Sequence, residues 1–470
     1  MADRVPGGQH SGGADLMRWL YSLLMALAQL GLPRKLARRA LAEPLYAEAV
    51  PERFGRYTGT WPAAPGLTIW VHAVSLGEAR TAALLIVRLR QALPGMRLLL
   101  THGTATGRAE GARLLQTGDA QAWLPWDSPG PVRRFLQQFR PDIGILIETE
   151  VWPNVVAACQ QQGVPLVLAN ARLSERSFHK AQRLAWLARP AYRALTAVWA
   201  QTPDDARRLQ ALGAPVQGVF GNLKFDAEPD ATQLAAGHAG RASLDRPVAM
   251  LASSRDGEEE KLLQIIEENW PLSQVGKGVV AIESIANQPQ WLIVPRHPQR
   301  FDAVAALVQA RGFALVRRSR GGPWPPTEAN GAGKREDRGD SGDRAGQTPT
   351  IWLGDSLGEM ALYYGLADVA LLGGSFEPLG GQNLIEAAAS GCPVLMGPHT
   401  FNFAEAAELA LAAGAAQRVS SMGEGVAAVR ALLAQPAQQH AMVHAALSFA
   451  GAHAGAGQRT ALAVQALLLA

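Results

Sequence analysis

Cysteine is scarce in this chain of 470 residues, which contains only Cys159 and Cys392. Both lie in apolar stretches, and neither belongs to a CxxC motif. The chain therefore has neither a disulfide framework nor a cysteine metal motif, which is typical of proteins from a reducing compartment. The ten histidines form no HExxH motif either. We predict no metal site.

An excess of one charge is also missing. Lys and Arg number 44 against 40 Asp and Glu, so the formal net charge is +4. So small an excess indicates acidic partners only weakly, and we expect no nucleic-acid partner. Hydrophobic residues make up 48% of the chain and charged residues 18%. This composition is that of a globular protein, and the length allows about two to three domains.

The apolar run near the N-terminus is short. It covers residues 19–33, WLYSLLMALAQLGLP, fewer than the roughly 20 residues that a bilayer-spanning helix needs. No A-x-A cleavage site follows it, which disfavours a signal peptide. Four basic residues come next: Arg34, Lys35, Arg38 and Arg39. We predict a disordered start over residues 1–13 and, within residues 1–45, a membrane-anchoring helix whose basic flank meets anionic lipid. The alternative is a core helix.

Beyond this segment, short apolar runs of strand type alternate with helical segments. The expected strands cover residues 68–73, 96–101, 121–125, 143–147, 164–169, 197–201 and 216–220. Such alternation predicts a parallel, doubly wound sheet, and we assign residues 46–226 to a first Rossmann-like domain. Ligands of such sheets bind beyond the carboxyl ends of the strands.

The polar segment 222–239 breaks this pattern, and we interpret it as an interdomain linker. A second Rossmann-like domain then covers residues 240–435, with strands expected at 248–252, 290–294, 351–353, 369–372 and 393–396. Two segments within it, 271–289 and 320–349, are interpreted as insertions, and the second as disordered. The last residues, 436–470, are alanine-rich and helical, and we expect them to pack back on the first domain.

The stretch 371–398 combines a strand, two glycine pairs, a short helix and a second strand. Glycines without Cβ let backbone N–H groups approach a phosphate at a helix N-terminus. Glu386, one turn into that helix, could bind both hydroxyls of a ribose. The spacing is not G-x-G-x-x-G, which disfavours a dinucleotide and a dehydrogenase. The alternative is a well-packed turn with a solvated acid.

Polar residues follow several strands of the first domain. Glu78 opens a helix directly after a strand, where it suits a general base or, alternatively, only stabilises the helix dipole. Glu148 and Glu150 would project to one side if the strand stays extended, and could bind sugar hydroxyls or shift each other's pKa. Alternatively they precede a helix N-terminus. Lys224 at the domain junction could neutralise a phosphate or a carboxylate, or be a surface lysine.

The second domain carries three segments suited to anions. Pro295 and Arg296 present a guanidinium fork after a buried strand. Leu357, Gly358 and Glu359 place backbone N–H groups at the start of a helix. The third segment holds Asn383, Leu384, Ile385 and Glu386. Three such segments at strand ends predict a nucleotide site.

Nine motifs along residues 19–419 together resemble the lipid A 3-deoxy-D-manno-octulosonic acid (Kdo) transferases. In chain order they are WVHAVSLGEARTA, GTATG, LPWDSPGPVRRFL, ETEVWPN, ANARLSERS, GNLKFD, LIVPRHPQRF, GDSLGEM and GGSFEPLGGQNLIEAAASGCPVLMGP. The resemblance implies the α/β GT-B fold, with two Rossmann-like domains facing a cleft. It also implies inverting transfer of Kdo from CMP-Kdo to a lipid A precursor (lipid IVA) in lipopolysaccharide biosynthesis. This family acts at the cytoplasmic side of the cell inner membrane and needs no metal or other cofactor.

The resemblance also assigns roles to the motif residues. It implies that Glu78 is the general base for the acceptor hydroxyl, and that Glu148 and Lys224 stabilise the transition state. The CMP-binding residues that it implies are Pro295, Arg296, Leu357, Gly358, Glu359, Asn383, Leu384, Ile385 and Glu386.

Two positions depart from the family pattern. Arg255 stands where the family usually has histidine, and His102 where threonine is commoner. Two rival functions follow from the same residues. One is another GT-B enzyme that uses a UDP-sugar, including sugar-nucleotide epimerases. The other is a membrane-associated binding protein without catalysis.

Overall fold

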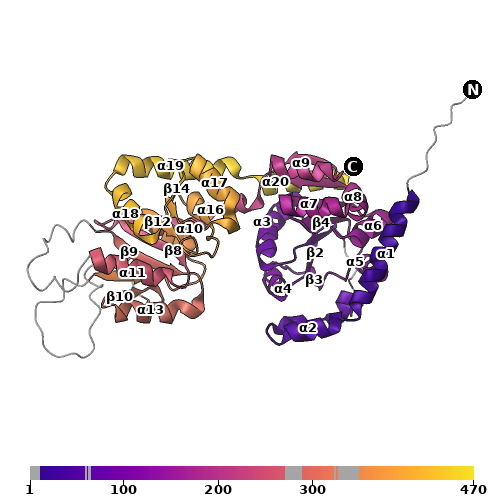
Figure 1. Ribbon diagram of the computed structural model, residues 1–470, viewed down its shortest axis with the longest axis horizontal. Helices are drawn as coiled ribbons and strands as arrows, with labels where there is room; N and C mark the ends of the chain where they lie inside the picture. Colours follow the sequence, from indigo (N-terminus) through magenta and orange to yellow (C-terminus); the bar gives the residue numbers. More distant parts are fainter. Residues whose placement is uncertain are drawn as a thin grey trace, which may run out of the picture. The chain divides into compact units, whose positions relative to one another are not determined.

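The computed structural model describes residues 11–58, 61, 65–269, 288–321, 324–326 and 349–469. The chain forms two compact units, the first of Met1–Asp226 with His453–Ala470 and the second of Ala227–Ala452 (Figure 1). The first helix, α1 (Ser11–Gln29), begins earlier than expected, so the predicted disorder is wrong for residues 11–13. Residues 1–10, for which disorder was predicted, lie outside the described residues, as do residues 271–287 and most of 320–349, which were interpreted as insertions.

Unit 1 contains one sheet of seven parallel strands in the order β3-β2-β1-β4-β5-β6-β7. The strands are β1 (Thr68–His72), β2 (Arg97–His102), β3 (Ala120–Trp123), β4 (Ile143–Ile147), β5 (Leu166–Ala171), β6 (Ala197–Ala200) and β7 (Val216–Val219). The predicted parallel sheet is confirmed. Because side chains alternate across a strand, β1 sends Trp70 to one face and its neighbours Ile69 and Val71 to the other.

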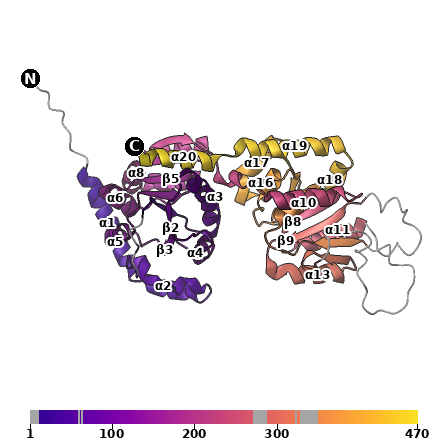
Figure 2. The same cartoon turned by 180° about the vertical axis from the view of Figure 1, so that it is seen from behind.

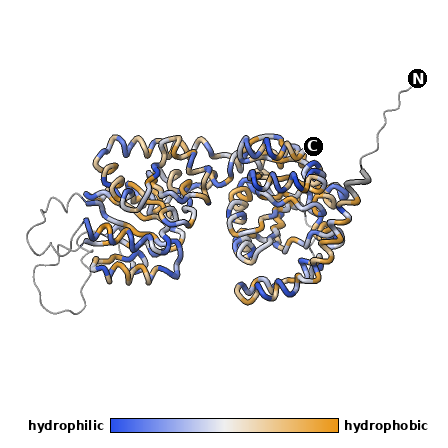
Figure 3. The backbone as a smooth tube through the Cα atoms, in the orientation of Figure 1, coloured by the Kyte–Doolittle hydropathy of each residue, from blue (hydrophilic) through white to orange (hydrophobic). Residues whose placement is uncertain are grey.

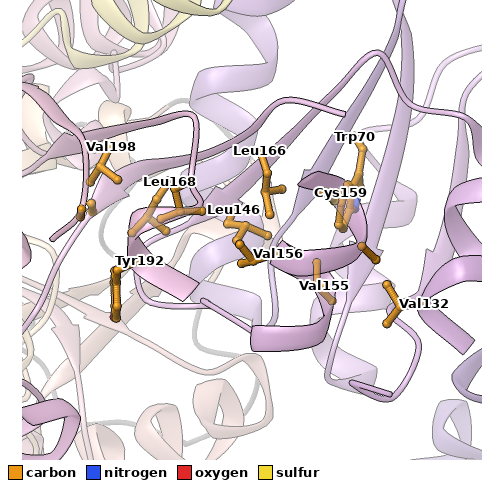
Figure 4. Close-up of a cluster of buried hydrophobic side chains, with 14 of the residues drawn as sticks. Trp70, Val132, Leu146, Val155, Val156, Cys159, Leu166, Leu168, Tyr192 and Val198 are labelled. Atoms are coloured by element: carbon orange, nitrogen blue, oxygen red, sulfur yellow. The ribbon is translucent and has the colours of Figure 1, made fainter. Parts of the chain in front are cut away.

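Helices cover both faces of this sheet. They are α3 (Leu76–Ala92), α4 (Ala105–Ala112), α5 (Pro129–Phe139), α6 (Pro153–Gln162), α7 (Glu175–Arg183), α8 (Ala185–Arg193) and α9 (Pro203–Ala211). Figure 4 shows the core on one face, where Trp70 and Leu146 of the sheet meet Val156 and Cys159 of α6. The core on the other face lies mainly under α3.

Unit 2 repeats this plan with the strand order β10-β11-β9-β8-β12-β13-β14, again all parallel. The strands are β8 (Val248–Ser254), β9 (Gln290–Pro295), β10 (Ala314–Arg317), β11 (Thr350–Leu353), β12 (Val369–Leu372), β13 (Val394–Met396) and β14 (Ala416–Arg418). The chain order reverses between β8 and β12, which is where doubly wound sheets bind ligands. Sequence reasoning missed the two edge strands, since β10 and β14 are short and only partly apolar.

The helices of unit 2 are α10 (Ala231–Ala242), α11 (Glu258–Asn269), α13 (Phe301–Ala310), α15 (Met360–Leu366), α16 (Leu384–Ala389), α17 (Ala404–Ala412), α18 (Met422–Leu433) and α19 (Pro436–His453). Trp324, inside the insertion predicted at 320–349, packs on Trp352 and Tyr363 with ring centroids 5.7 and 6.4 Å away. The prediction of disorder is therefore wrong at this residue, because an indole finds an aromatic surface there.

The segment predicted as a linker, residues 222–239, is mostly helical. It contains the short 3-10 helix η3 (Leu223–Asp226) and most of α10. α10 packs closely on α15, and a Cβ built on Gly237 would lie 2.3 Å from the Leu362 carbonyl oxygen. The boundary between the two units lies within this segment, after Asp226, as the linker interpretation expected. The segment is nevertheless mostly helical, because its polar residues face solvent while Gly237 forms a helix contact.

The chain ends in unit 1 with α20 (Ala456–Leu469), which lies against α3 (Figure 2). Ala461 and Val464 of α20 belong to the core under α3. The carboxylate of Asp226 accepts the N–H groups of Gly455, Ala456 and Gly457 at 2.6, 3.1 and 2.5 Å. Unit 1 is therefore built from both ends of the sequence.

Candidate functional site

Glu78 lies in the first turn of α3, directly beyond the carboxyl end of β1. Its N–H donates to Ser75 Oγ (3.3 Å), and its carboxylate accepts the Val74 N–H (2.6 Å) and the Ser75 hydroxyl (3.3 Å). This arrangement is a variant of the capping box in which the carboxylate accepts the N–H one residue before the N-cap, Ser75. Burial nevertheless raises the pKa of Glu78 to about 7 against the lowering effect of the Val74 hydrogen bond, and Glu148 and Glu150 add smaller contributions that also raise it. A half-buried carboxylate with this pKa can accept a proton near neutral pH.

Glu148 and Glu150 follow β4, the strand beside β1. Both raise the pKa of Glu78, so the three carboxylates lie within electrostatic range of one another. Glu148 has a φ of +64°, which ends the extended geometry that the sequence analysis considered for this pair. A non-glycine residue in this conformation stores strain, which functional sites often do. Burial also raises the pKa of Glu150.

Lys224 belongs to η3, which is held at the carboxyl end of β5. Asn170, the penultimate residue of β5, accepts the Leu223 N–H through Oδ1 (3.0 Å), and Asn222 accepts the Lys224 N–H (3.0 Å). η3 also packs on α3. The three predicted catalytic residues, Glu78, Glu148 and Lys224, are thus positioned along one edge of neighbouring strands β1, β4 and β5.

A cavity of about 530 Å³ lies between the N-terminal helices and the carboxyl ends of β1 and β2, and it is lined by Val74, whose N–H donates to Glu78. Its walls are mainly apolar and include residues of α1 and of α2 (Leu32–Ala40). Three cationic side chains line it, Lys35, Arg39 and Arg53, together with the acids Asp127 and Glu150. The cavity can hold an apolar molecule that carries an anionic group.

Arg53 connects this cavity with Glu78. Its guanidinium lies over the Trp123 ring at 3.9 Å, and Nη2 donates to the Gly103 carbonyl (3.2 Å). The Gly103 N–H donates in turn to the Val74 carbonyl, and the Val74 N–H to Glu78. Within the described residues, the buried Nε of Arg53 has no hydrogen-bond partner. Burial lowers the pKa of Arg53 to about 10, so the side chain stays charged at neutral pH.

α1 attaches to unit 1 through its polar side. Tyr21 donates to Asp127 (2.8 Å), Ser22 to Asn154 (3.0 Å) and Gln29 to Ser128 (2.5 Å). The opposite side of α1 exposes large apolar side chains: Leu16, Trp19, Leu20, Leu23, Leu24 and Leu27. The alternative of a core helix is therefore wrong.

The basic residues of α2 follow α1 directly in the chain (Figure 3). In the part of the chain that the structure describes, no helix is long and apolar enough to cross a membrane.

In unit 2, two predicted CMP-binding segments lie close together. Arg296 is exposed directly after β9, and its N–H donates to the Ser254 carbonyl (3.0 Å). The phenol of Tyr364 has a raised pKa because of burial first and of Glu386 second, while Arg296 opposes this shift. Arg296 and Glu386, 90 residues apart, therefore both lie within electrostatic range of one tyrosine. Asn383 caps α16 by accepting the Ile385 N–H (3.2 Å).

The segment of Leu357, Gly358 and Glu359 precedes α15. Leu357 is 71% exposed, and the Gly358 carbonyl accepts a hydrogen bond from Gln233 (2.9 Å). The Glu359 carboxylate is paired with Arg318 through two hydrogen bonds (3.0 and 2.8 Å), which hold its pKa below the usual range. Glu359 therefore fastens this loop to Arg318.

In the glycine pairs of unit 2, three backbone N–H groups are not available to a phosphate as the sequence predicted. The Gly373 N–H donates to Ala252, the Gly374 N–H to Glu258 and the Gly381 N–H to Gly374, each at 2.8 Å. For these three N–H groups the predicted phosphate contact is wrong, since partners within the protein already use them. Glu258, which takes the Gly374 N–H, is fully buried.

Metal ligands do not cluster in the described part of the chain, where no three His, Cys, Asp or Glu side chains could share an ion. His440 and His444 are four residues apart on α19, both exposed, and lack a third ligand there.

Comparison with known proteins decides the family. A family model described as 3-Deoxy-D-manno-octulosonic-acid transferase (kdotransferase) matches residues 48–227. The 3-deoxy-D-manno-octulosonic acid transferase of Bordetella pertussis is 45% identical over 415 residues, which are 87% of this chain and 90% of the relative. This chain belongs to the Kdo transferase family. The transferase of Haemophilus influenzae is 30% identical over 89% of this chain and 91% of its own. As a family member, the chain is a glycosyltransferase enzyme.

Solved structures show the fold. UDP-GlcNAc 2-epimerase from Neisseria meningitidis matches 86% of this chain and 100% of its own, with a TM-score of 0.52 and 16% identity. A glycosyltransferase from Rickettsia africae matches 86% of this chain and 99% of its own, with a TM-score of 0.50 and 13% identity. These likenesses agree with two parallel-sheet domains of GT-B type, as the family resemblance implied.

Sequence reasoning missed the cavity and its cations. Arg53 lies in a short segment, Pro51–Phe54 in sequence, that gave no catalytic pattern. Its position depends on Trp123 and Gly103, which are more than 45 residues away in the chain. The only signal for this site was the basic run after residue 33, which was interpreted as a flank of the membrane anchor.

Proposed function

We propose that this enzyme transfers Kdo from CMP-Kdo to a lipid A precursor, lipid IVA, in lipopolysaccharide biosynthesis. The transfer inverts the anomeric carbon and uses no metal. The observation that carries the proposal is Glu78, a half-buried carboxylate with a pKa of about 7 that is hydrogen-bonded to Val74 in the wall of an apolar, cation-lined cavity. Family membership supports the sugar, and the family resemblance supports the CMP-activated donor.

Glu78 acts as the general base in this proposal. Its carboxylate takes the proton of an acceptor glucosamine hydroxyl, and that oxygen forms a bond to the anomeric carbon of Kdo. The bond from this carbon to the phosphate oxygen breaks, and CMP leaves with the electron pair from the opposite face. CMP is a good leaving group that needs cationic support more than protonation. Arg296 at the end of β9 supplies a cation, with Asn383 and Glu386 as polar contacts to the nucleotide.

Glu148 and Lys224 stabilise the transition state in the same proposal. Positive charge develops on the sugar ring and negative charge on the departing phosphate. A carboxylate suits the first charge and an ammonium group the second. The supporting observation is that both residues occupy the sheet edge that carries Glu78, and that Glu148 has a strained backbone.

The acceptor binds in the cavity of unit 1. Its apolar walls suit acyl chains, and Lys35, Arg39 and Arg53 suit an acceptor phosphate. α1 lies in the surface of the cytoplasmic side of the cell inner membrane, with its exposed leucines and Trp19 in the lipid. The basic residues of α2 contact anionic headgroups. A lipid acceptor then reaches the cavity from the membrane, because the same two helices form its outer wall.

The deciding experiment combines turnover with binding. Purified enzyme is assayed for transfer from CMP-Kdo to lipid IVA, with UDP-sugars as competing donors, and CMP binding is measured by calorimetry. We expect Glu78→Gln to reduce transfer by about 10²–10⁴-fold while CMP affinity is unchanged. Glu175→Gln, which replaces an exposed first-turn acid of α7, is the matched control and should keep full activity.

Two outcomes would contradict the proposal. Wild-type enzyme that uses a UDP-sugar and not CMP-Kdo would favour the rival GT-B activity. Full transfer by Glu78→Gln would leave Glu78 only its role in the capping box.

A further inference from the structure

Arg255 follows β8 in unit 2, at the point where the strand order of the sheet reverses. Its backbone is fixed on two sides. The Arg255 N–H donates to Glu258 Oε2 (2.9 Å), and the same carboxylate accepts the N–H groups of Gly374 (2.8 Å) and Phe376 (3.2 Å) from the loop after β12. On the other side, the preceding residue Ser254 accepts the Arg296 N–H from the loop after β9 (3.0 Å). Arg255 is therefore held between three loops.

Within the described residues, the guanidinium of Arg255 has no hydrogen-bond or ion-pair partner, and its Nε is buried. The neighbouring acids are already engaged. Arg300 pairs with both Asp256 and Glu259, and Ser254 also donates to Glu259 (2.5 Å). Glu258 uses its oxygens for three backbone N–H groups. The side chain is half-buried, and a buried N–H donor without an acceptor costs free energy that an acceptor from outside the protein would offset.

The surroundings of Arg255 combine further cationic side chains with a glycine that has no side chain. Gly374 is next to the side chain, since a Cβ built on this glycine would lie 3.5 Å from Arg255 Cγ. The pKa of His297 is lowered by desolvation first and then by Arg255 and Arg296, with Asp256 opposing. Two guanidinium groups and a histidine therefore share the ends of β8 and β9.

We propose that Arg255 binds the anionic part of the CMP-sugar donor, either its phosphate or the sugar carboxylate, and so sets donor affinity. The proposal rests on the proposed function for the identity of the donor. A guanidinium fork binds either group through two parallel N–H···O bonds. Glu258 fixes the backbone of Arg255 and of the adjoining glycine loop.

The experiment compares wild type with Arg255→Gln and Arg255→Lys, using cytidine, CMP and CMP-Kdo. If the phosphate is bound, Arg255→Gln weakens CMP binding by about 10–100-fold and leaves cytidine binding unchanged. If the carboxylate is bound, CMP binding is unchanged and KM for CMP-Kdo rises by the same factor. Arg255→Lys keeps part of the affinity in either case. Arg320→Gln, at an exposed arginine of unit 2, is the control.

A second variant tests the charge itself. Arg255→His keeps a cation only below a pH of about 6.5, the ordinary pKa of histidine. Its Kd for CMP, or its KM for CMP-Kdo, should therefore rise relative to wild type between pH 5.5 and pH 8. The proposal is overturned if Arg255→Gln, folded by circular dichroism, binds all three ligands as wild type does. CMP binding by wild type is measured without turnover, so failure of the proposed Kdo transfer is recognised separately.

Discussion

At the scale of single residues, Glu78 combines two roles that the sequence analysis treated as alternatives. It completes a capping box, and it also holds a carboxylate whose pKa is about 7. The Val74 N–H and the helix N-terminus favour the charged form, while burial and two neighbouring acids favour the neutral form. The capping contacts thus orient a base that its surroundings bring close to neutral pH.

The raised pKa predicts the acid side of the pH profile. Transfer requires the Glu78 carboxylate, so kcat/KM should rise about tenfold per pH unit below pH 7 and level off above it. Glu150→Gln removes an acid that raises the pKa of Glu78, so it should move this limb to lower pH. Profiles are measured from pH 5 to 9 with CMP-Kdo saturating. If the acid limb of the profile lies at the same pH in wild type and in Glu150→Gln, the assignment of this limb to Glu78 is contradicted.

The position of Arg53 in the cavity wall predicts that it selects for a phosphorylated acceptor. Arg53→Met removes the cation at the cavity while the side chain can still pack on Trp123. KM for a phosphorylated acceptor should rise by about 10–100-fold, with little change for an acceptor that lacks the phosphate. Arg108→Met is the matched control, because Arg108 also lies over Trp123 (4.9 Å) but pairs with Glu52 and does not line the cavity. Equal effects of the two variants would argue against a phosphate at Arg53.

At the scale of secondary-structure elements, α10 and α15 show how glycine decides a helix contact. Gly237 and Gly365 face each other, and a Cβ on Gly365 would lie 2.7 Å from the Leu234 carbonyl oxygen. Two backbones approach this closely only where side chains are absent. The polar composition of residues 222–239 concealed the helix, since one side of it is solvated.

This contact predicts an unusual effect of alanine. Alanine normally stabilises a helix relative to glycine by about 1 kcal/mol. Gly237→Ala should instead destabilise unit 2 by about 1–3 kcal/mol, because the new methyl group meets the α15 backbone. At Gly451 on α19, no heavy atom of the described residues outside the local helix backbone lies within 4 Å of an added Cβ, so Gly451→Ala should be neutral or slightly stabilising. Chemical denaturation compares the two, and similar values would show that α10 and α15 can separate at little cost.

α1 predicts a membrane-surface contact. Its outward leucines are exposed although its polar side is bonded to unit 1, an inversion of the usual amphipathic arrangement in a soluble protein. Leu24→Glu should reduce co-sedimentation with vesicles that contain anionic phospholipid. Leu462→Glu, at an exposed leucine of α20, should leave it unchanged. Unchanged binding by Leu24→Glu would refute the proposed orientation of α1.

At the scale of the whole molecule, α20 makes unit 1 depend on a helix that follows all of unit 2 in the sequence. α20 contributes Ala461 and Val464 to the core under α3, and Gln465 donates to the Ala92 carbonyl at the end of α3 (2.8 Å). Asp226, the last residue of the first segment of unit 1, caps this helix. The Asp226 carboxylate therefore joins the two chain segments that make up unit 1.

Asp226→Ala tests this connection. Loss of a buried cap that accepts three N–H groups should lower the stability of unit 1 by about 2 kcal/mol and increase hydrogen exchange in α20. Asp230→Ala removes the exposed cap of α10, which accepts the Gln233 N–H (2.9 Å), and should cost about 1 kcal/mol in unit 2. Exchange measured by mass spectrometry separates the units. Unchanged protection of α20 in Asp226→Ala would mean that packing alone holds this helix.

The sequence by itself determined both parallel sheets, the family and the residues that end the strands. Alternating apolar runs are local signals, and Glu78, Glu148 and Arg296 lie at strand ends because their motifs adjoin those runs. The tertiary structure decided which side chains these strand-end residues contact. Only packing over long chain separations places Arg53 on Trp123 and brings Glu258 to the Gly374 N–H. The same packing leaves the Arg255 guanidinium without a partner among the described residues. The pKa of Glu78 also belongs to this second group, since burial and two acids from another strand raise it. These contacts and pKa shifts depend on distances in space, which cannot be read from the spacing of residues along the chain.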